Sequence, residues 1–186
     1  MKRLAVFASG SGSNFEAIVR ACEEQRIPAR VTMLVTDHPE AYVVKRALKH
    51  GIAVFAFRPK EFESKAHYEQ AIIHALGEQV DLICLAGYMR IVGQTLLSQY
   101  TGRIINIHPA LLPSFAGAHG IRDAFDYGVK VFGVTIHYVD ETLDGGKIIR
   151  QRGFEYYGND IEELESKIHQ VEHQLYVETI NELLTE

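Results

Sequence analysis

The chain has no tryptophan, only five prolines and only two cysteines among its 186 residues. Cys22 and Cys84 both lie in apolar contexts, so the sequence predicts neither a disulfide framework nor a metal cluster. No apolar run approaches the length of a membrane span. The apolar residues that follow Met1-Lys2-Arg3 are too few for the core of a signal peptide. We therefore expect a cytoplasmic protein with no membrane association.

Positive charge does not predominate, because 19 lysines and arginines stand against 24 aspartates and glutamates and the formal net charge is −5. A general nucleic-acid binder needs a basic surface, so nucleic acid is not an expected partner. The hydrophobic fraction of 47% and the charged fraction of 23% are ordinary for a globular protein. A chain of this length can bury a proper core. We expect one domain, or two closely merged halves, and a monomer or weak homodimer.

Apolar strands alternate with helical segments along the chain. The patterns predict strands at 4–8, 31–36, 54–57, 82–86, 104–108 and 148–154, and helices at 15–24, 42–50, 62–79, 121–127 and 161–184. Alternation over 131–138 predicts a further, half-buried strand, for which antiparallel pairing is an option. Asp160 is the expected N-cap of the last helix. This order predicts an α/β fold with a Rossmann-like, mostly parallel central sheet flanked by helices.

A loop of small residues, Ser9-Gly10-Ser11-Gly12-Ser13-Asn14, follows the first strand. Gly10 and Gly12 let a ligand approach the backbone closely, and Ser13 or Asn14 can cap the next helix. The free N–H groups and the positive dipole end of that helix favour an anion. The pattern predicts a phosphate site, and the alternative is a loop that merely turns the chain.

A dinucleotide is a second candidate ligand for this loop. The Rossmann fingerprint requires a third glycine at the position of Phe15. Its acidic residue has a counterpart, because Asp37 follows the second strand. The missing glycine favours a single phosphate, while NAD stays open.

Two polar side chains, Asn106 and His108, lie two residues apart on the fifth strand and therefore point to the same side. Pro109 and Pro113 stiffen the loop beyond it, where parallel α/β sheets bind ligands. The alternative is a buried pair satisfied by backbone groups. At the end of the fourth strand, Gly87 invites backbone contact with a ligand.

Met89, Ile91 and Val92 follow Gly87 in an apolar stretch. These side chains could line a flat, hydrophobic ligand site, and core packing is the rival interpretation.

Asp144, in an acidic loop at 139–146, completes a possible catalytic set. An amide and an imidazolium can stabilise an oxyanion, and a carboxylate favours the charged imidazole and fixes its ring. The set suits acyl-type transfer without a covalent intermediate, because no nucleophile elbow occurs. His169 and His173 lie four apart on the last helix, but no further ligands complete a metal site around them. No metal is expected.

The motifs resemble those of the folate-dependent formyltransferases. The resemblance covers essentially the whole chain and rests on the segments Phe7–Asn14, Leu85–Arg90, Asn106–Pro113 and Asp144–Gly146. The first of these is similar to the phosphoribosylglycinamide formyltransferase branch of de novo purine synthesis. The family implies the formyltransferase fold, small-molecule substrates and 10-formyltetrahydrofolate as co-substrate. It also implies direct attack on the formyl group by the amine of 5′-phosphoribosylglycinamide, through a tetrahedral intermediate.

The resemblance also implies residue roles. The catalytic residues would be Asn106, His108 and Asp144. The ribonucleotide would contact Ser11, Gly12, Ser13, Asn14, Gly87 and Glu172. The folate would contact Lys65, Met89, Arg90, Ile91, Val92, Asn106, Asp140 and Asp144. Residues of about 1–100 would form the phosphate- and nucleotide-binding half, and residues of about 101–186 the folate and catalytic half.

The chain departs from the family pattern in two places. Many members have a lysine and an aromatic residue where this chain has Ser114-Phe115-Ala116-Gly117, and Ala110 replaces the more usual serine.

Three other functions share some of these features. Methionyl-tRNA formyltransferases share the signature of the fifth strand, but their chains are longer and more basic and include a tRNA-binding module. Formyltetrahydrofolate hydrolases carry an N-terminal regulatory domain, which we do not expect before Leu4. A non-catalytic phosphate-binding module would leave the polar residues without a chemical role.

Overall fold

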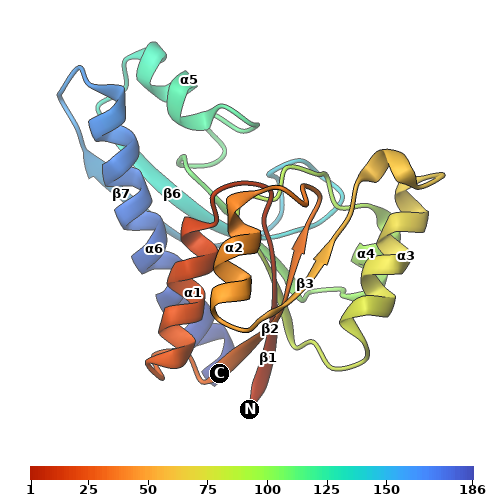
Figure 1. The fold of residues 1–186 in the computed structure, drawn as a ribbon. Helices are drawn as coiled ribbons and strands as arrows, with labels where there is room; N and C mark the ends of the chain where they lie inside the picture. The colour runs from red at the N-terminus through yellow and green to blue at the C-terminus, as the bar shows by residue number, and fades with distance from the viewer.

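Seven strands form one continuous sheet in the order β3-β2-β1-β4-β5-β6-β7. The protein is described by a computed structural model of residues 1–186. The strands are β1 (Lys2–Phe7), β2 (Ala29–Thr36), β3 (Ala53–Ala56), β4 (Leu82–Leu85), β5 (Ile104–His108), β6 (Val131–Tyr138) and β7 (Ile148–Glu155). Neighbours from β3 to β5 pair in parallel, whereas β6 and β7 are antiparallel. The predicted α/β architecture is confirmed (Figure 1).

Six α-helices accompany the sheet (Figure 1). They are α1 (Ser13–Glu23), α2 (Tyr42–Lys49), α3 (Lys65–Leu76), α4 (Gln94–Gln99), α5 (Gly120–Tyr127) and α6 (Ile161–Thr185), with a 3₁₀ turn at Pro59–Glu61. The clusters of buried residues place α1, α2 and α6 on one face and α3 and α4 on the other. None of the helices combines the length and the apolar character that crossing a membrane requires.

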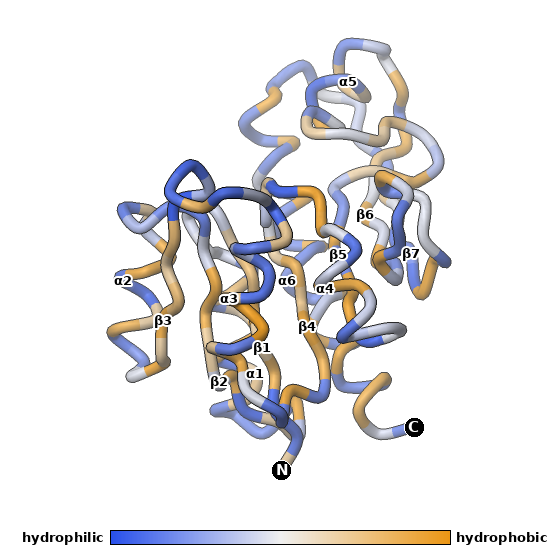
Figure 2. Tube along the Cα trace, turned by 90° about the vertical axis from the view of Figure 1, so that its right-hand side faces the viewer, coloured by the Kyte–Doolittle hydropathy of each residue, from blue (hydrophilic) through white to orange (hydrophobic).

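The central strands are buried on both faces. Along β1, Leu4 and Val6 belong to the cluster under α1 and α6, while Ala5 and Phe7 belong to the cluster under α3 and α4. Strands covered on both faces are apolar throughout, and Figure 2 shows β1 and β4 hydrophobic along most of their length. Rigid central strands of this kind hold the loops at their ends in fixed positions.

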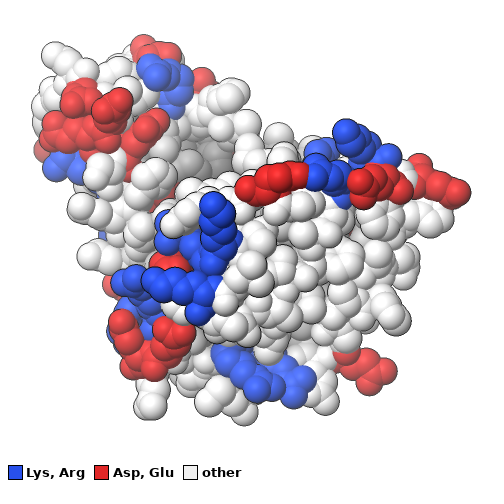
Figure 3. Space-filling model, viewed as in Figure 1, with Lys and Arg blue, Asp and Glu red and all other residues white.

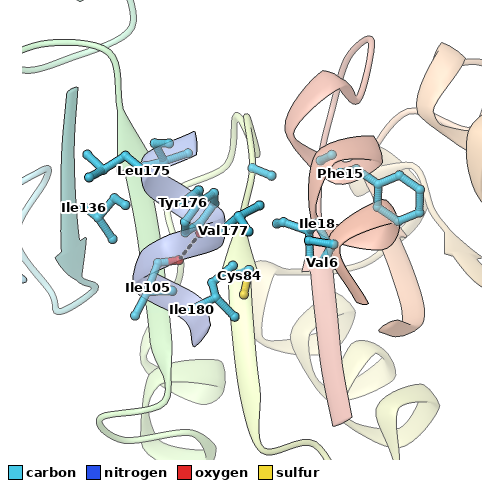
Figure 4. Packing of buried hydrophobic residues seen from close by; sticks show 14 of the residues in the cluster. Val6, Phe15, Ile18, Cys84, Ile105, Ile136, Leu175, Tyr176, Val177 and Ile180 are labelled. Carbon is cyan, nitrogen blue, oxygen red and sulfur yellow. Dashed lines mark hydrogen bonds between the residues drawn. The ribbon is translucent and has the colours of Figure 1, made fainter. Parts of the chain in front are cut away.

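Tyr176 on α6 joins two neighbouring strands. Its hydroxyl donates to the carbonyl oxygen of Leu85, at 2.8 Å, and to that of Ile105, at 3.3 Å. Figure 4 shows its ring on α6, among apolar side chains of α6 and beside β4 and β5. Complete burial raises the pKa of this phenol, so the hydroxyl stays a donor. Tyr176 thus joins the last residue of β4 to β5.

Several boundaries differ from the sequence prediction. The third helix begins at Lys65 rather than at Phe62, because the Ser64 hydroxyl accepts from the His67 N–H and caps it there. The first helix begins at Ser13, and its N-cap is Gly12 with φ +78° and no capping side chain. The expected capping by Ser13 or Asn14 was wrong. Helix α4 was not predicted, because six residues carry little periodicity.

Strand β6 is antiparallel and far more buried than expected. Six consecutive residues, 132–137, are buried. The partners explain this: α6 packs on one side, and the segment after β5 covers the other. The Thr135 hydroxyl donates to the Ala110 carbonyl and accepts from the Leu112 N–H. The Asp160 carboxylate, as predicted, caps the last helix by accepting from Glu162 and Glu163 N–H.

Candidate active site

A cavity of about 520 Å³ opens at the carboxyl ends of β1, β4 and β5. Figure 3 shows this surface hollowed between the part of the molecule that carries α5 and the body of the sheet. The lining comes from the loop after β1, the segment after β4, the end of β5, the acidic loop and α6. All predicted site residues except Lys65 belong to the lining. The structure therefore brings together motifs that lie far apart in the sequence.

The small-residue loop and the start of α1 form one end of this cavity. Residues 10–14 all line it. The N–H groups of Ser11 and Gly12 donate to no protein acceptor, and the Asn14 Oδ1 atom is buried without a partner. Free N–H groups at the start of an eleven-residue helix favour an anion.

Two α6 residues, His169 and Glu172, also line the cavity. Glu172 is buried, and its Oε2 lies 2.7 Å from Nδ1 of His169. This hydrogen bond raises the pKa of His169 above its ordinary value of 6.5, against the opposing effect of burial. The prediction included Glu172 and missed His169. Its spacing of three residues from Glu172 on a helix was the available signal.

A buried carboxylate, that of Asp37, fixes the segment that follows β4. The Ser9 hydroxyl donates to Asp37 and accepts from the Met89 N–H at 2.9 Å, and Arg90 Nε donates to Asp37 at 2.9 Å. Burial favours the neutral carboxyl, but hydrogen bonds from Ser9, His38 and Arg90 outweigh it and hold the pKa of Asp37 below 3.8. Asp37 is thus engaged inside the protein and not free to bind a ribose.

The apolar stretch beyond it divides between cavity and core. Met89 is 63% exposed and Ile91 59%, while Val92 is buried in the cluster under α3 and α4. Large apolar side chains left this open beside a cavity suit a flat apolar ligand. Met89 and Ile91 fit the ligand-site interpretation, whereas Val92 both lines the cavity and packs in the core.

Lys65 does not reach the cavity. Its ammonium donates to the Ile91 carbonyl at 2.8 Å, and Glu69, one turn later on α3, accepts from the Gly93 N–H at 2.8 Å. Both side chains therefore hold the backbone just beyond Met89. A direct contact between Lys65 and the folate stays a prediction.

Asn106, His108 and Asp144 lie close together in the lining of the cavity. His108 Nε2 donates to the Phe115 carbonyl at 2.8 Å, which fixes the ring. His108 Nδ1 lies 3.6 Å from Asp144 Oδ2, and that oxygen accepts from the Gly117 N–H at 2.8 Å. Each ring nitrogen of His108 therefore faces an oxygen acceptor. The separation of 3.6 Å between Nδ1 and Oδ2 is too long for a direct hydrogen bond, so Nδ1 keeps its hydrogen-bonding capacity for a ligand.

His137 is a fourth member that sequence reasoning missed. It pairs with Asn106 across the antiparallel strands, and its Nε2 lies 3.2 Å from Asn106 Nδ2. Its Nδ1 lies 2.9 Å from the Tyr138 carbonyl, so Nδ1 is the donor and Nε2 accepts from the Asn106 amide. His137 thus orients the amide and leaves its second N–H free. The sequence feature that could have identified His137 is its spacing of two from Thr135, which places two polar side chains on one face of the strand.

Known proteins resemble this chain in sequence over nearly its whole length. A family model described as formyl transferase matches residues 2–180. Phosphoribosylglycinamide formyltransferase of Bacillus subtilis (strain 168) is 52% identical over 186 residues, covering 99% of this chain and 95% of that protein. The chain belongs to the phosphoribosylglycinamide formyltransferase family. It is an enzyme, and the expected family and enzyme class are confirmed.

Solved structures of the family agree with the fold. The phosphoribosylglycinamide formyltransferase of Bacillus halodurans superposes with a TM-score of 0.96 at 50% identity, over 100% of this chain and 96% of that chain. Glycinamide ribonucleotide transformylase 1 of Geobacillus kaustophilus also gives 0.96, at 53% identity, over 99% of both chains. The interpretation as a non-catalytic phosphate-binding module is therefore wrong.

Proposed function

We propose that this formyltransferase moves the formyl group of 10-formyltetrahydrofolate to the amine of 5′-phosphoribosylglycinamide in de novo purine biosynthesis. One observation carries the proposal. The polar set of Asn106, His108 and Asp144 lines one cavity together with an anion site at the start of α1 and the open apolar side chains of Met89 and Ile91. A phosphorylated acceptor and a flat, apolar donor fit these two parts of the lining.

The residues suit the donor and the acceptor in different ways. We assign Ser11, Gly12, Ser13, Asn14, Gly87 and Glu172 to the ribonucleotide, with His169 added. We assign Met89, Arg90, Ile91, Val92, Asp140 and Asp144 to the folate. Asn106 contacts the folate and also takes part in the chemical step. Binding both substrates in one cavity converts a bimolecular encounter into a reaction within a complex, which lowers the barrier by fixing the reacting atoms.

Chemistry proceeds by direct attack. The amine nitrogen forms a bond to the formyl carbon, and the formyl oxygen takes up negative charge in a tetrahedral intermediate. The free N–H of Asn106 and the Nδ1–H of His108 donate to this oxygen, and Asp144 supports the charged imidazole. The intermediate collapses by breaking the bond to the folate nitrogen. His108 or a water relays the proton released by the amine to that nitrogen.

Four wider features stay predictions. The division near residue 100 is not strict in the assignments above, because Met89 belongs to the first half and Glu172 to the second. A monomer or weak homodimer, a cytoplasmic location and the absence of a metal are also expected.

A formyl-transfer assay with three acceptors tests the proposal. The purified enzyme is given 10-formyltetrahydrofolate together with 5′-phosphoribosylglycinamide, with charged initiator tRNA, or with water alone. We expect rapid formylation of the ribonucleotide and no more than background turnover with the other two. Transfer to tRNA, or hydrolysis as fast as transfer, would overturn the proposed acceptor.

A further inference from the structure

Helix α2 holds the small-residue loop although none of its residues lines the cavity. The Val43 N–H donates to the Gly10 carbonyl at 3.1 Å, and Arg46 Nε donates to the Ser11 carbonyl at 2.8 Å. A Cβ atom on Gly12 would lie 2.7 Å from Val43 Cβ, so the helix packs directly on that residue. Three consecutive loop positions are thus fixed by one turn of α2, which stands beside α1 in Figure 1.

These contacts set the direction of two peptide groups. In a trans peptide the carbonyl of one residue and the N–H of the next point in opposite directions. Val43 draws the Gly10 carbonyl toward α2, so the Ser11 N–H points away from α2. Arg46 draws the Ser11 carbonyl the same way, so the Gly12 N–H also points away. Both residues line the cavity and neither N–H has a protein acceptor. Successive N–H groups that converge in this way form an anion-binding nest.

Arg46 is itself held on several sides. Its guanidinium lies 4.9 Å from the centre of the Tyr42 ring, and Nη1 lies 3.6 Å from Glu16 Oε2. Its side chain is 27% exposed, compared with 60% for Arg20, which pairs with the same carboxylate. A guanidinium fixed by stacking and by an ion pair is a well-oriented donor, which a lysine ammonium cannot reproduce.

We infer that Arg46 is a positioning residue for the phosphate of the ribonucleotide, acting through the Ser11 carbonyl to aim the Gly12 N–H into the cavity. This rests on the proposed function. A hydrogen bond from a charged group contributes about 1.5–3 kcal/mol, which corresponds to about 10- to 100-fold in affinity. The effect should fall on phosphate recognition alone, because Arg46 lies outside the cavity that holds the reacting groups.

The test compares Arg46→Met and Arg46→Lys with the control Arg20→Met. The control removes an arginine that also pairs with Glu16, at 2.9 Å, but bonds no loop carbonyl. Initial rates are measured with 5′-phosphoribosylglycinamide and with its dephosphorylated ribonucleoside, at varied folate. For Arg46→Met we expect KM for the ribonucleotide to rise about 10- to 100-fold, with kcat and the folate KM within about twofold.

The dephosphorylated acceptor separates positioning from general damage. Its kcat/KM should be the same in the wild type and in Arg46→Met, because no phosphate is present to use the nest. Arg46→Lys should recover only part of the affinity, and Arg20→Met should match the wild type. Equal losses with both acceptors, full recovery by lysine, or no change in the ribonucleotide KM would each overturn the inference. A wild-type enzyme that does not formylate the ribonucleotide would instead refute the proposed function.

Discussion

Replacing Asp144 by asparagine removes one negative charge and preserves the shape of the side chain. Asp144 has φ +50°, a left-handed conformation that asparagine adopts readily, so the backbone should not change. The asparagine oxygen can still accept from the Gly117 N–H. What disappears is the charge 3.6 Å from His108 Nδ1. The variant therefore isolates the electrostatic part of the proposed role.

The size of the effect follows from Coulomb's law. At the 3.6 Å separation, an effective dielectric constant of about 20 gives an attraction of about 4–5 kcal/mol between the carboxylate and an imidazolium. Both side chains are largely buried, at 5% and 11% exposure, so screening by solvent is limited. Since about 1.4 kcal/mol corresponds to a tenfold change in rate, kcat should fall by about three to four orders of magnitude.

Steady-state kinetics with both substrates measures this prediction. The ribonucleotide KM should barely change, because the anion site at the start of α1 is not altered. Asp140→Asn serves as a comparison, since it removes the same charge from the same loop and should affect the folate KM rather than kcat. Turnover by Asp144→Asn within tenfold of the wild type would refute the assigned role of the carboxylate.

Three further variants test other parts of the structure. Tyr176→Phe loses the hydroxyl that joins two strands, so unfolding by denaturant should cost about 1–2 kcal/mol less, with kcat unchanged. A stability equal to the wild type would show that the bridge contributes nothing. Gly12→Ala combines a φ of +78° with a Cβ placed 2.7 Å from Val43 Cβ, and should cost about 2–5 kcal/mol and raise the ribonucleotide KM. Because Glu172 raises the pKa of His169, the stabilising pair is fully formed below about pH 6.5 and is lost as pH rises through the raised value. The difference in Tm between wild type and His169→Gln should therefore shrink with rising pH, and a constant difference would contradict it.

Much of the molecule could be predicted because its signals are local. Period-two alternation placed Asn106 and His108 on one side of a strand, and both line the cavity. His137 was missed because its contact with Asn106 depends on the register of two antiparallel strands, which single-strand patterns do not contain. Lys65 was placed at the folate because the family resemblance implies a basic residue at that position. Its direction is set by the Ile91 carbonyl, a tertiary contact.

The contacts of Asp37 limit how this enzyme could be redesigned to bind a dinucleotide. An acidic residue at this strand end is what dinucleotide-binding proteins use to recognise a ribose. Here Arg90 binds it, and Phe15, fully buried, stands where such proteins need glycine. Freeing the carboxylate requires losing the hydrogen bonds from both Ser9 and Arg90. Opening the loop requires removing a core aromatic ring at a cost of at least about 3–5 kcal/mol. That is a large part of the stability of an ordinary domain. No single substitution leads from this enzyme to a dinucleotide binder, so the two uses of the fold are separated by an unstable intermediate sequence.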